Sequence, residues 1–249
     1  MKSPESTAYE GRVELKVHTG LDSLYTSILR EAFCKNSDED NAIVRSILSA
    51  VVLVMDPLSP SAIGTLMGFE CDEVLSLLKS IHSLLALRDD TNHPIHHPIQ
   101  PFHKSFPDFI TDPTRCNDLR FYIPPCYHAE IAIQCLQLMG KSLKRNMCSV
   151  PDYTLNSEVA DLQTRIEKSG IHGALEHACR SWHRHLIVKA DQIVDVISAL
   201  RSFLEGKFLF WLEVLSVLGV MGDAACALNA TIKWLNEVRS DSRLAYCLS

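Results

Sequence analysis

The sequence lacks an apolar run long enough to cross a membrane. Its longest apolar stretches are residues 47–55, which fall short of the ~20 residues of a spanning helix, and residues 208–221, which carry Glu213 near the middle. Residues 1–16 contain no apolar segment of the kind found in secretory signals. We therefore expect a cytoplasmic protein with no membrane partner.

Basic residues and paired cysteines are also scarce. Lys and Arg number 24 against 30 Asp and Glu, a net charge of −6, whereas proteins that bind nucleic acid cluster their cations. The nine cysteines are scattered without C-x-x-C pairs, a pattern that favours a reducing compartment over a disulfide scaffold. We predict that nucleic acid is not a partner.

No complete phosphate-binding glycine loop is present. Residues 139–142 (MGKS) match the end of a P-loop, but Cys135 stands where its first glycine belongs. Gly140 is instead predicted to end a helix as its C-cap. We therefore expect that the chain is not an enzyme and binds no nucleotide by itself.

Histidines form two groups, and neither has the pattern of a zinc site. Zinc needs three or four ligands in fixed geometry, usually with cysteines at short spacing, and the nearest cysteines to the first group are Cys71 and Cys116. The first group is predicted to lie near a hairpin tip and comprises His93, His96, His97 and His103. The second is interpreted as solvated helix positions and comprises His177, His183 and His185.

The apolar pattern is mostly helical, which predicts a mainly α protein. Residues 42–55 are apolar nearly all round, as in a buried helix. Ser59 as N-cap, Pro60 at the first helical position and Gly68 past the end predict a short helix. An amphipathic helix precedes both, and its predicted inward face comprises Leu21, Leu24, Tyr25, Ile28, Leu29 and Phe33.

A small β-hairpin is predicted to follow the third helix of this region. That helix begins at Cys71 or Asp72, residues 88–94 form a turn-rich tip, and residues 95–102 return as a short irregular strand. Three helices followed by a hairpin is the order of a winged helix. We therefore predict a winged-helix domain over residues 38–116.

The remainder of the chain predicts a helical stack. A helix runs from Tyr127 to Gly140, and between residues 171 and 235 helix follows helix with short breaks. This spacing is typical of antiparallel pairs stacked in a superhelix or solenoid. The expected division is a disordered N-terminus (1–20), a helix (21–37), the winged-helix domain (38–116), the helical stack (117–240) and a tail (241–249).

The segment 94–116 joins these two regions. Ser105 is predicted to cap a short helix whose phenylalanines face a core, and Asp112 before a proline ends it. His103 stands between the predicted strand and this helix. By residue type alone, its ring is most simply explained as satisfied by backbone groups.

The sequence FHKSFPDFI around His103 resembles a family signature. It is similar to Phe-x-His-x-Ser-Phe-x-(Glu/Asp)-Phe, which closes the winged-helix domain of NACHT-type signalling NTPases of the NOD-like receptor class. Residues 21–29 resemble the end of the helical domain that follows the nucleotide-binding core of fungal members with WD40 repeats. Residues 143–148, 177–186 and 211–219 resemble the superhelical segment of the same proteins. The signature positions are Phe102, His103, Ser105, Phe106, Asp108 and Phe109.

The resemblance implies a role for His103. In the family this histidine contacts the β-phosphate of ADP and holds the resting state, and fungal members act in non-self recognition and programmed cell death. This chain lacks the Walker core, an effector domain and WD40 blades, so it resembles the middle of such a protein. The implied function is a non-catalytic regulatory module whose partner, a NACHT nucleotide-binding core, would supply the ADP or ATP.

Two other functions stay open. The helical stack could serve as a stand-alone protein–protein adaptor, which would expose an apolar strip along residues 203–221. A winged helix most often binds DNA, yet the third helix opens with Glu70, Asp72 and Glu73. Only Lys79 offsets these acids, which repel phosphates, so DNA binding is the weaker alternative.

Overall fold

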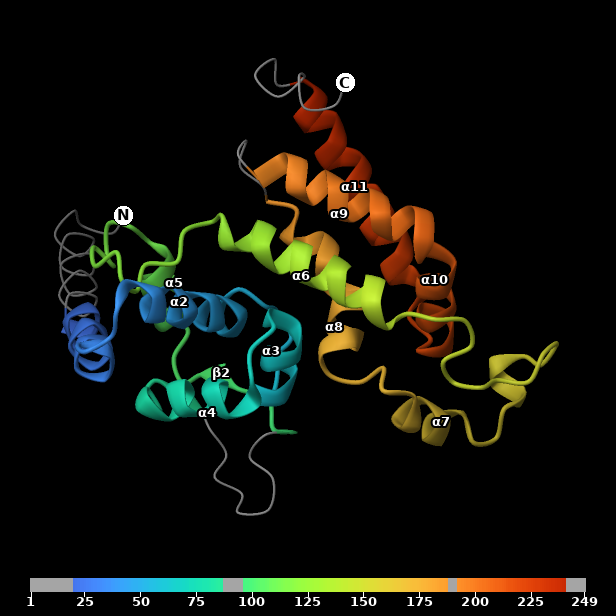
Figure 1. The fold of residues 1–249 in the computed structure, drawn as a ribbon, viewed down its shortest axis with the longest axis horizontal. Coiled ribbons are helices and arrows are strands. Elements are labelled where there is room, and N and C mark those ends of the chain that lie inside the picture. The colour runs from blue at the N-terminus through green and yellow to red at the C-terminus, as the bar shows by residue number, and fades with distance from the viewer. Residues whose placement is uncertain (1–19, 87–95, 188–191, 241–249) are drawn as a thin grey trace, which may run out of the picture.

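The computed structural model describes residues 20–86, 96–187 and 192–240, and most of them are helical (Figure 1). The predicted mainly α class is therefore confirmed. Several predicted features lie outside the described residues: the N-terminal segment up to residue 19, the whole hairpin tip (88–94) with His93, and the tail 241–249.

The first element of the described residues is a helix over residues 20–33. The next elements are α2 (Asp38–Val52), α3 (Pro60–Met67), α4 (Cys71–Ser80), β1 (Leu85–Ala86), β2 (Gln100–Pro101) and α5 (Ser105–Thr111). They are followed by α6 (Tyr127–Ser142), η2 (Asn156–Glu158), α7 (Leu162–Ser169), α8 (Ala174–Ser181), η3 (Trp182–His185), α9 (Ile193–Gly206), α10 (Phe208–Val217) and α11 (Met221–Ser240).

Capping residues determine where α2 and α3 begin. The Ser59 hydroxyl accepts the Ala62 N–H at 3.2 Å, and Gly68 ends α3 with a φ of 80°, as the sequence predicts. The predicted start of α2 at residue 42 is wrong. Ser37 and Asp40 form a capping box, with the Asp40 N–H 3.1 Å from the Ser37 hydroxyl, and this starts the helix four residues earlier.

The β-hairpin is shorter than predicted. β1 and β2 pair antiparallel with Leu85 opposite Pro101, whereas a strand was expected over residues 95–102. Proline has no N–H for the ladder, and Ile99 donates its N–H to the Leu58 carbonyl at 2.9 Å instead of to β1. The hairpin is thereby tied to the loop that precedes α3.

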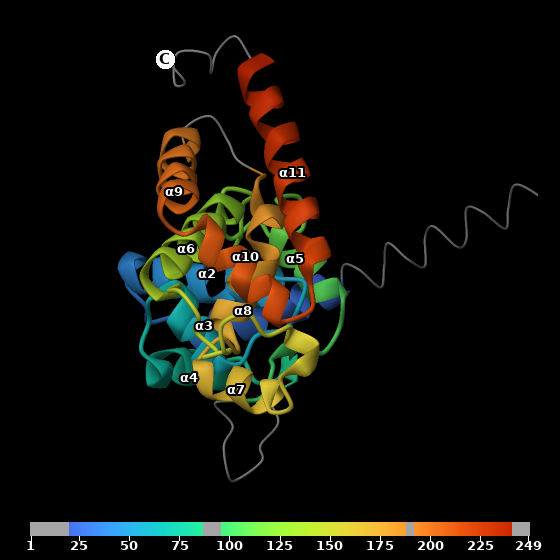
Figure 2. The same ribbon diagram turned by 90° about the vertical axis from the view of Figure 1, so that its right-hand side faces the viewer.

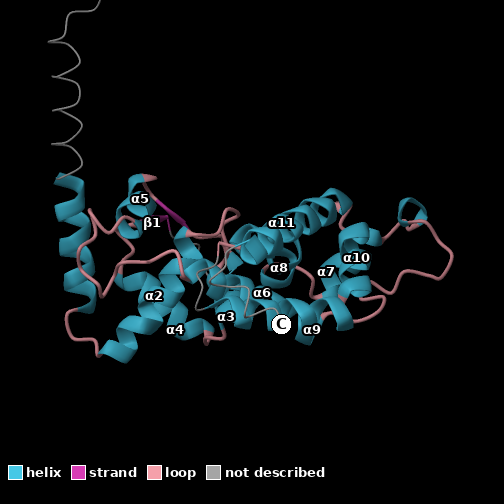
Figure 3. Cartoon of the chain, turned by 90° about the horizontal axis from the view of Figure 1, so that it is seen from above, coloured by secondary structure: helices cyan, strands magenta, loops and turns pink. Residues whose placement is uncertain are grey.

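α6 is surrounded by other helices. It packs against α2, α3, α8, η3 and α9, and in the view of Figure 1 α3 and α8 lie below it and α9 above it. Figure 3 shows α2 and α5 toward one end of the molecule, α10 toward the other, and α6 between them. The predicted end at Gly140 is wrong, because α6 continues to Ser142. A helical glycine costs about 1 kcal/mol relative to alanine, which the burial of the α6 side chains can offset.

The C-terminal helices do not pack only with their neighbours in sequence. α9 packs on α6, α11 packs on α8 and η3, and α10 connects them (Figure 2). Trp182, Phe203 and Trp211 meet in this core with ring centroids 5.7–6.3 Å apart. The Trp211 indole also donates to the Cys179 carbonyl at 2.8 Å, so its one polar group is satisfied.

Two further expectations can be compared with the described residues. None of their helices combines the length and apolar character that crossing a bilayer requires. Their cysteines are all free thiols.

The first helix buries a narrower face than its pattern predicts. Tyr25, Leu29 and Phe33, spaced four residues apart, are buried, whereas Leu24 is 52% exposed. A spacing of four residues keeps side chains on one line along a helix, and Leu24 lies beside that line.

This difference gives a matched pair of substitutions on one helix. Leu29→Ala should lower the free energy of unfolding by about 2–5 kcal/mol, because it opens a cavity at a position with 0% exposure. Leu24→Ala should change it by less than about 0.5 kcal/mol. Urea unfolding followed by circular dichroism measures both, and equal losses would contradict this assignment of the buried face.

Candidate functional site

His103 lies at the junction of β2 and α5, and its side chain is exposed. The backbone is anchored on both sides of it. Before it, Phe102 donates its N–H to the Leu84 carbonyl at 3.0 Å. After it, α5 is held in the core by the predicted residues Phe106, Phe109 and Ile110, which are buried. The imidazole therefore projects from a fixed segment.

A chain of hydrogen bonds orients the imidazole. The Tyr25 hydroxyl lies 2.8 Å from the Ser105 hydroxyl, which lies 2.6 Å from Nδ1 of His103. Ser105 also donates its backbone N–H to Nδ1 at 3.1 Å. The prediction that Ser105 is the N-cap is wrong, because Lys104 holds that position and Ser105 begins the helix. The Ser105 hydroxyl is buried and positions His103 instead.

These bonds also determine the tautomer. A backbone N–H can only donate, so Nδ1 of His103 acts as the acceptor. In the neutral ring the proton must then sit on Nε2, on the other side of the imidazole. In that tautomer the exposed ring presents an N–H donor, which suits an anionic oxygen.

The other histidines of the first group do not complete a metal site in the described residues. His96 and His97 both interact with other residues, and His93 lies outside the described part of the chain. The described residues contain no group of three or more His, Cys, Asp and Glu side chains placed to hold a metal ion.

The second group of histidines was misinterpreted. His177 and His185 are not solvated, since their exposure is 5% and 2%. His185 lies with its Nδ1 3.0 Å from Nδ1 of His128, a residue that the sequence pattern did not single out. His183 lies next to Trp182 and is half-buried. Together they form a histidine cluster between α6, α8 and η3.

Burial keeps this histidine cluster neutral. Loss of hydration lowers the pKa of His177 to about 4, with Asp56 opposing the shift and Arg184 adding to it. Burial and then the neighbouring His128 lower the pKa of His185 to about 3. Neither nitrogen of His177 has a hydrogen-bond partner in the described structure. The cluster thus resists protonation, and the structure suggests no ligand for it.

The glycine-lysine-serine sequence has no phosphate-binding geometry. Gly140, Lys141 and Ser142 form the last turn of α6, with no strand before them and no helix beginning at them. A P-loop needs both of these neighbours to direct its backbone N–H groups at a phosphate. His103 therefore stays the candidate nucleotide-contacting residue.

Comparison with known proteins adds no relative. No family model, no curated protein and no solved structure matches the chain. The relation to NACHT-type NTPases therefore stays a prediction, carried by the residues around His103.

The histidine cluster predicts acid sensitivity. The folded-state pKa of His177 is about 4, below the unfolded value of about 6.5, so the unfolded chain takes up a proton more readily. Stability should be complete above about pH 6.5 and decline as the pH falls toward 4. Between about pH 7.5 and 5, His177 alone should cost on the order of 2 kcal/mol of unfolding free energy.

Urea unfolding at several pH values measures this slope in matched variants. His177→Leu should flatten it, because leucine binds no proton, whereas His82→Leu at an exposed position should leave it unchanged. An equal slope in wild type and His177→Leu would show that His177 is protonated without cost in the folded chain.

Proposed function

We propose that the chain is a non-catalytic regulatory module of a NACHT-type signalling NTPase. Residues 38–116 act as a winged helix that senses the nucleotide state, and residues 117–240 connect it to a sensor domain. The observation that carries this proposal is His103, an exposed ring whose Nδ1 is held by Ser105 and whose Nε2–H is free to meet a phosphate.

The element order of the first half supports the winged-helix assignment. α2, α3 and α4 are followed by the antiparallel pair β1 and β2, which is the order of a winged helix. His103 lies two residues after β2, and in the family the signature closes the winged-helix domain. The wing of this domain is short, since β1 and β2 each have 2 residues.

The surface beside His103 suits a protein partner. Phe102 is 66% exposed although it is a large apolar residue, and it immediately precedes the imidazole. A nucleotide-binding core that covered this ring would place its bound ADP within reach of Nε2. ADP or ATP is thus a ligand of the assembly, supplied by the core, and this chain contributes one donor.

Ion pairs hold the surroundings of His103 in place. The Arg115 guanidinium donates two hydrogen bonds to the carboxylate of Asp22 on the first helix, at 2.7 and 3.1 Å. Asp118 accepts from both Arg30 and Arg120, and these hydrogen bonds hold the pKa of its carboxyl well below the usual range. The loop after α5 is therefore fixed to the same helix whose Tyr25 orients the site.

The test joins the full chain to a NACHT-type nucleotide-binding core and measures ADP release. His103→Ala should speed ADP release about tenfold, because it removes one hydrogen bond to a charged phosphate. His172→Ala, at another exposed histidine, should leave the rate unchanged. Ser105→Ala keeps the ring but removes the hydroxyl that orients it, and should give an intermediate rate.

Unchanged ADP retention and unchanged resting-state signalling in His103→Ala would reject the sensor role. The chain without a core is expected to bind no ADP, so calorimetry on it alone provides the blank.

A protein–protein adaptor is the second candidate, and one observation favours it. Within residues 203–221, Leu204, Leu209 and Met221 are 39%, 73% and 46% exposed. Exposed apolar side chains on neighbouring helices are a surface that a partner can cover.

A photo-crosslinking residue at position 209 should then capture a discrete partner in cell extract, whereas one at the exposed Tyr153 should not. Equal capture at the two positions would count against the adaptor.

DNA binding is the weakest of the three functions. Glu70, Asp72 and Glu73 are exposed at the start of α4, the helix that would enter the major groove. Only Lys79 on that helix could offset them, so a phosphate backbone would be repelled.

A further inference from the structure

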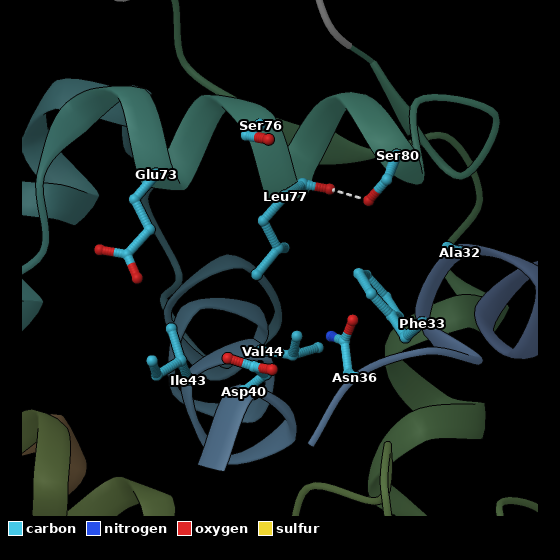
Figure 4. Close-up of a pocket in the computed structure, with 10 residues that line it drawn as sticks. All are labelled: Ala32, Phe33, Asn36, Asp40, Ile43, Val44, Glu73, Ser76, Leu77 and Ser80. Atoms are coloured by element: carbon cyan, nitrogen blue, oxygen red, sulfur yellow. Dashed lines mark hydrogen bonds between the residues drawn. The ribbon is translucent and has the colours of Figure 1, made fainter. Parts of the chain in front are cut away.

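A groove runs between α2 and α4, away from the His103 network. It has a volume of about 410 Å³ and is lined by the end of the first helix, the start of α2 and one side of α4. Figure 4 shows Leu77 of α4 directed toward Ile43 and Val44 of α2, with Phe33 at one end. Neither His103 nor its hydrogen-bond partners Tyr25 and Ser105 line it.

The floor of the groove is apolar, and its accessible part is small. Phe33 and Val44 are buried, whereas Ile43 and Leu77 are half-buried, so parts of two branched side chains remain open to solvent. A single apolar side chain of a partner could cover both and remove them from water.

The rim of the groove is acidic. Asp40 on α2 and Glu73 on α4 face the open space from opposite walls, and none of the lining residues is Lys, Arg or His (Figure 4). Three further exposed acids, Asp38, Glu39 and Asp72, lie in the first turns of these helices.

Helix capping accounts for one carboxylate oxygen of Asp40 and for none of Glu73. Oδ2 of Asp40 accepts from the Ser37 backbone N–H at 3.1 Å and from the Ser37 hydroxyl at 2.9 Å, so its Oδ1 stays available. The Glu73 carboxylate makes no hydrogen bond or ion pair with any described residue. Acids near helix starts stabilise the helix dipole, but that role does not require Glu73 to face Asp40 across a groove.

We propose that this groove binds a basic amphipathic helix of a partner protein. An apolar side chain of that helix would cover Ile43 and Leu77, and Lys or Arg side chains would pair with Glu73 and Asp40. Charge complementarity selects this occupant. An acidic segment would be repelled by the two carboxylates, and a purely apolar segment would remove them from water without giving them a partner. The site is independent of the nucleotide contact proposed for His103.

The probe is a synthetic helical peptide of about 14 residues built from leucine and lysine, with a leucine–glutamate peptide of the same length as its counterpart. Fluorescence anisotropy on the full chain should give saturable binding of the lysine peptide only. Glu73→Lys should weaken that binding about tenfold, because it replaces an attraction by a repulsion.

The matched control is Glu205→Lys, an exposed substitution on α9 with the same change of net charge. It should weaken binding less than about twofold, since it lies outside the groove. Amide chemical-shift changes on peptide addition should centre on Asn36, Ser76 and Leu77.

Several outcomes would overturn the proposal. Equal weakening by Glu73→Lys and Glu205→Lys, or shift changes centred outside the groove, would show general attraction to an acidic protein. A concentration-dependent dimer that is lost in Glu73→Lys would assign the groove to a second copy of the chain. Retained far-ultraviolet circular dichroism in each variant ensures that weakened binding reports the groove and not unfolding.

Discussion

The burial of α6 among its neighbours is the constraint on which the rest of the structure depends. It packs against α2, α3, α8, η3 and α9, and α3 also packs against α8. Its buried residues include Ala129 and Ala132, whose small side chains allow neighbouring helices to approach closely. Two hydrogen bonds join α2 to α6. The Ser46 hydroxyl donates to the Glu130 carboxylate at 2.5 Å, and the Arg45 guanidinium donates to the Tyr127 hydroxyl at 3.2 Å. A shift of α2 along α6 would break these contacts together.

The contact of α6 with η3 belongs to the histidine cluster, and this joint has a different character. His128 of α6 meets His185 of η3, while His177 of α8 lies buried without hydrogen-bond partners. Asp56 and Arg184, from the loop after α2 and from η3, act on the charge of His177 from opposite directions. An unpaired buried imidazole costs free energy, so this joint is held by apolar packing around it and not by its polar groups. The α2–α6 contact and the α6–η3 contact should therefore respond differently to acid.

Local signals predicted much of the fold. The Ser59, Pro60 and Gly68 pattern located α3, because each residue has a specific backbone preference that tertiary contacts did not override. Gly140 failed as a helix end, since its backbone is not in the left-handed conformation and α6 is held by burial on both sides. Ser105 failed as a cap because Tyr25, 80 residues away in sequence, engages its hydroxyl.

Long-range contacts also explain the misinterpreted histidines. His177, Ser181 and His185 recur every four residues beside Ala178 and Trp182, so they continue an apolar face. That spacing could have predicted their burial, but the polar character of histidine favoured the interpretation as solvated positions. His128 carries no such signal, because only the packing of α6 against η3 brings it to His185. The exposed position of His103, by contrast, follows from its place between a strand and a helix.

Electrostatics restrict how an acidic chain can meet a diphosphate. The net charge of −6 disfavours a phosphate, and so does the rim of the α2–α4 groove, which is lined by two carboxylates and no cation. In the proposed function His103 would avoid this difficulty, because it offers a hydrogen-bond donor next to Lys104, whose cation is exposed. The two proposed sites would therefore separate two chemistries, with a donor for anions at the β2–α5 junction and carboxylates for cations between α2 and α4. Such a separation would let one nucleotide-loaded core and one basic segment bind without competing for the same charges.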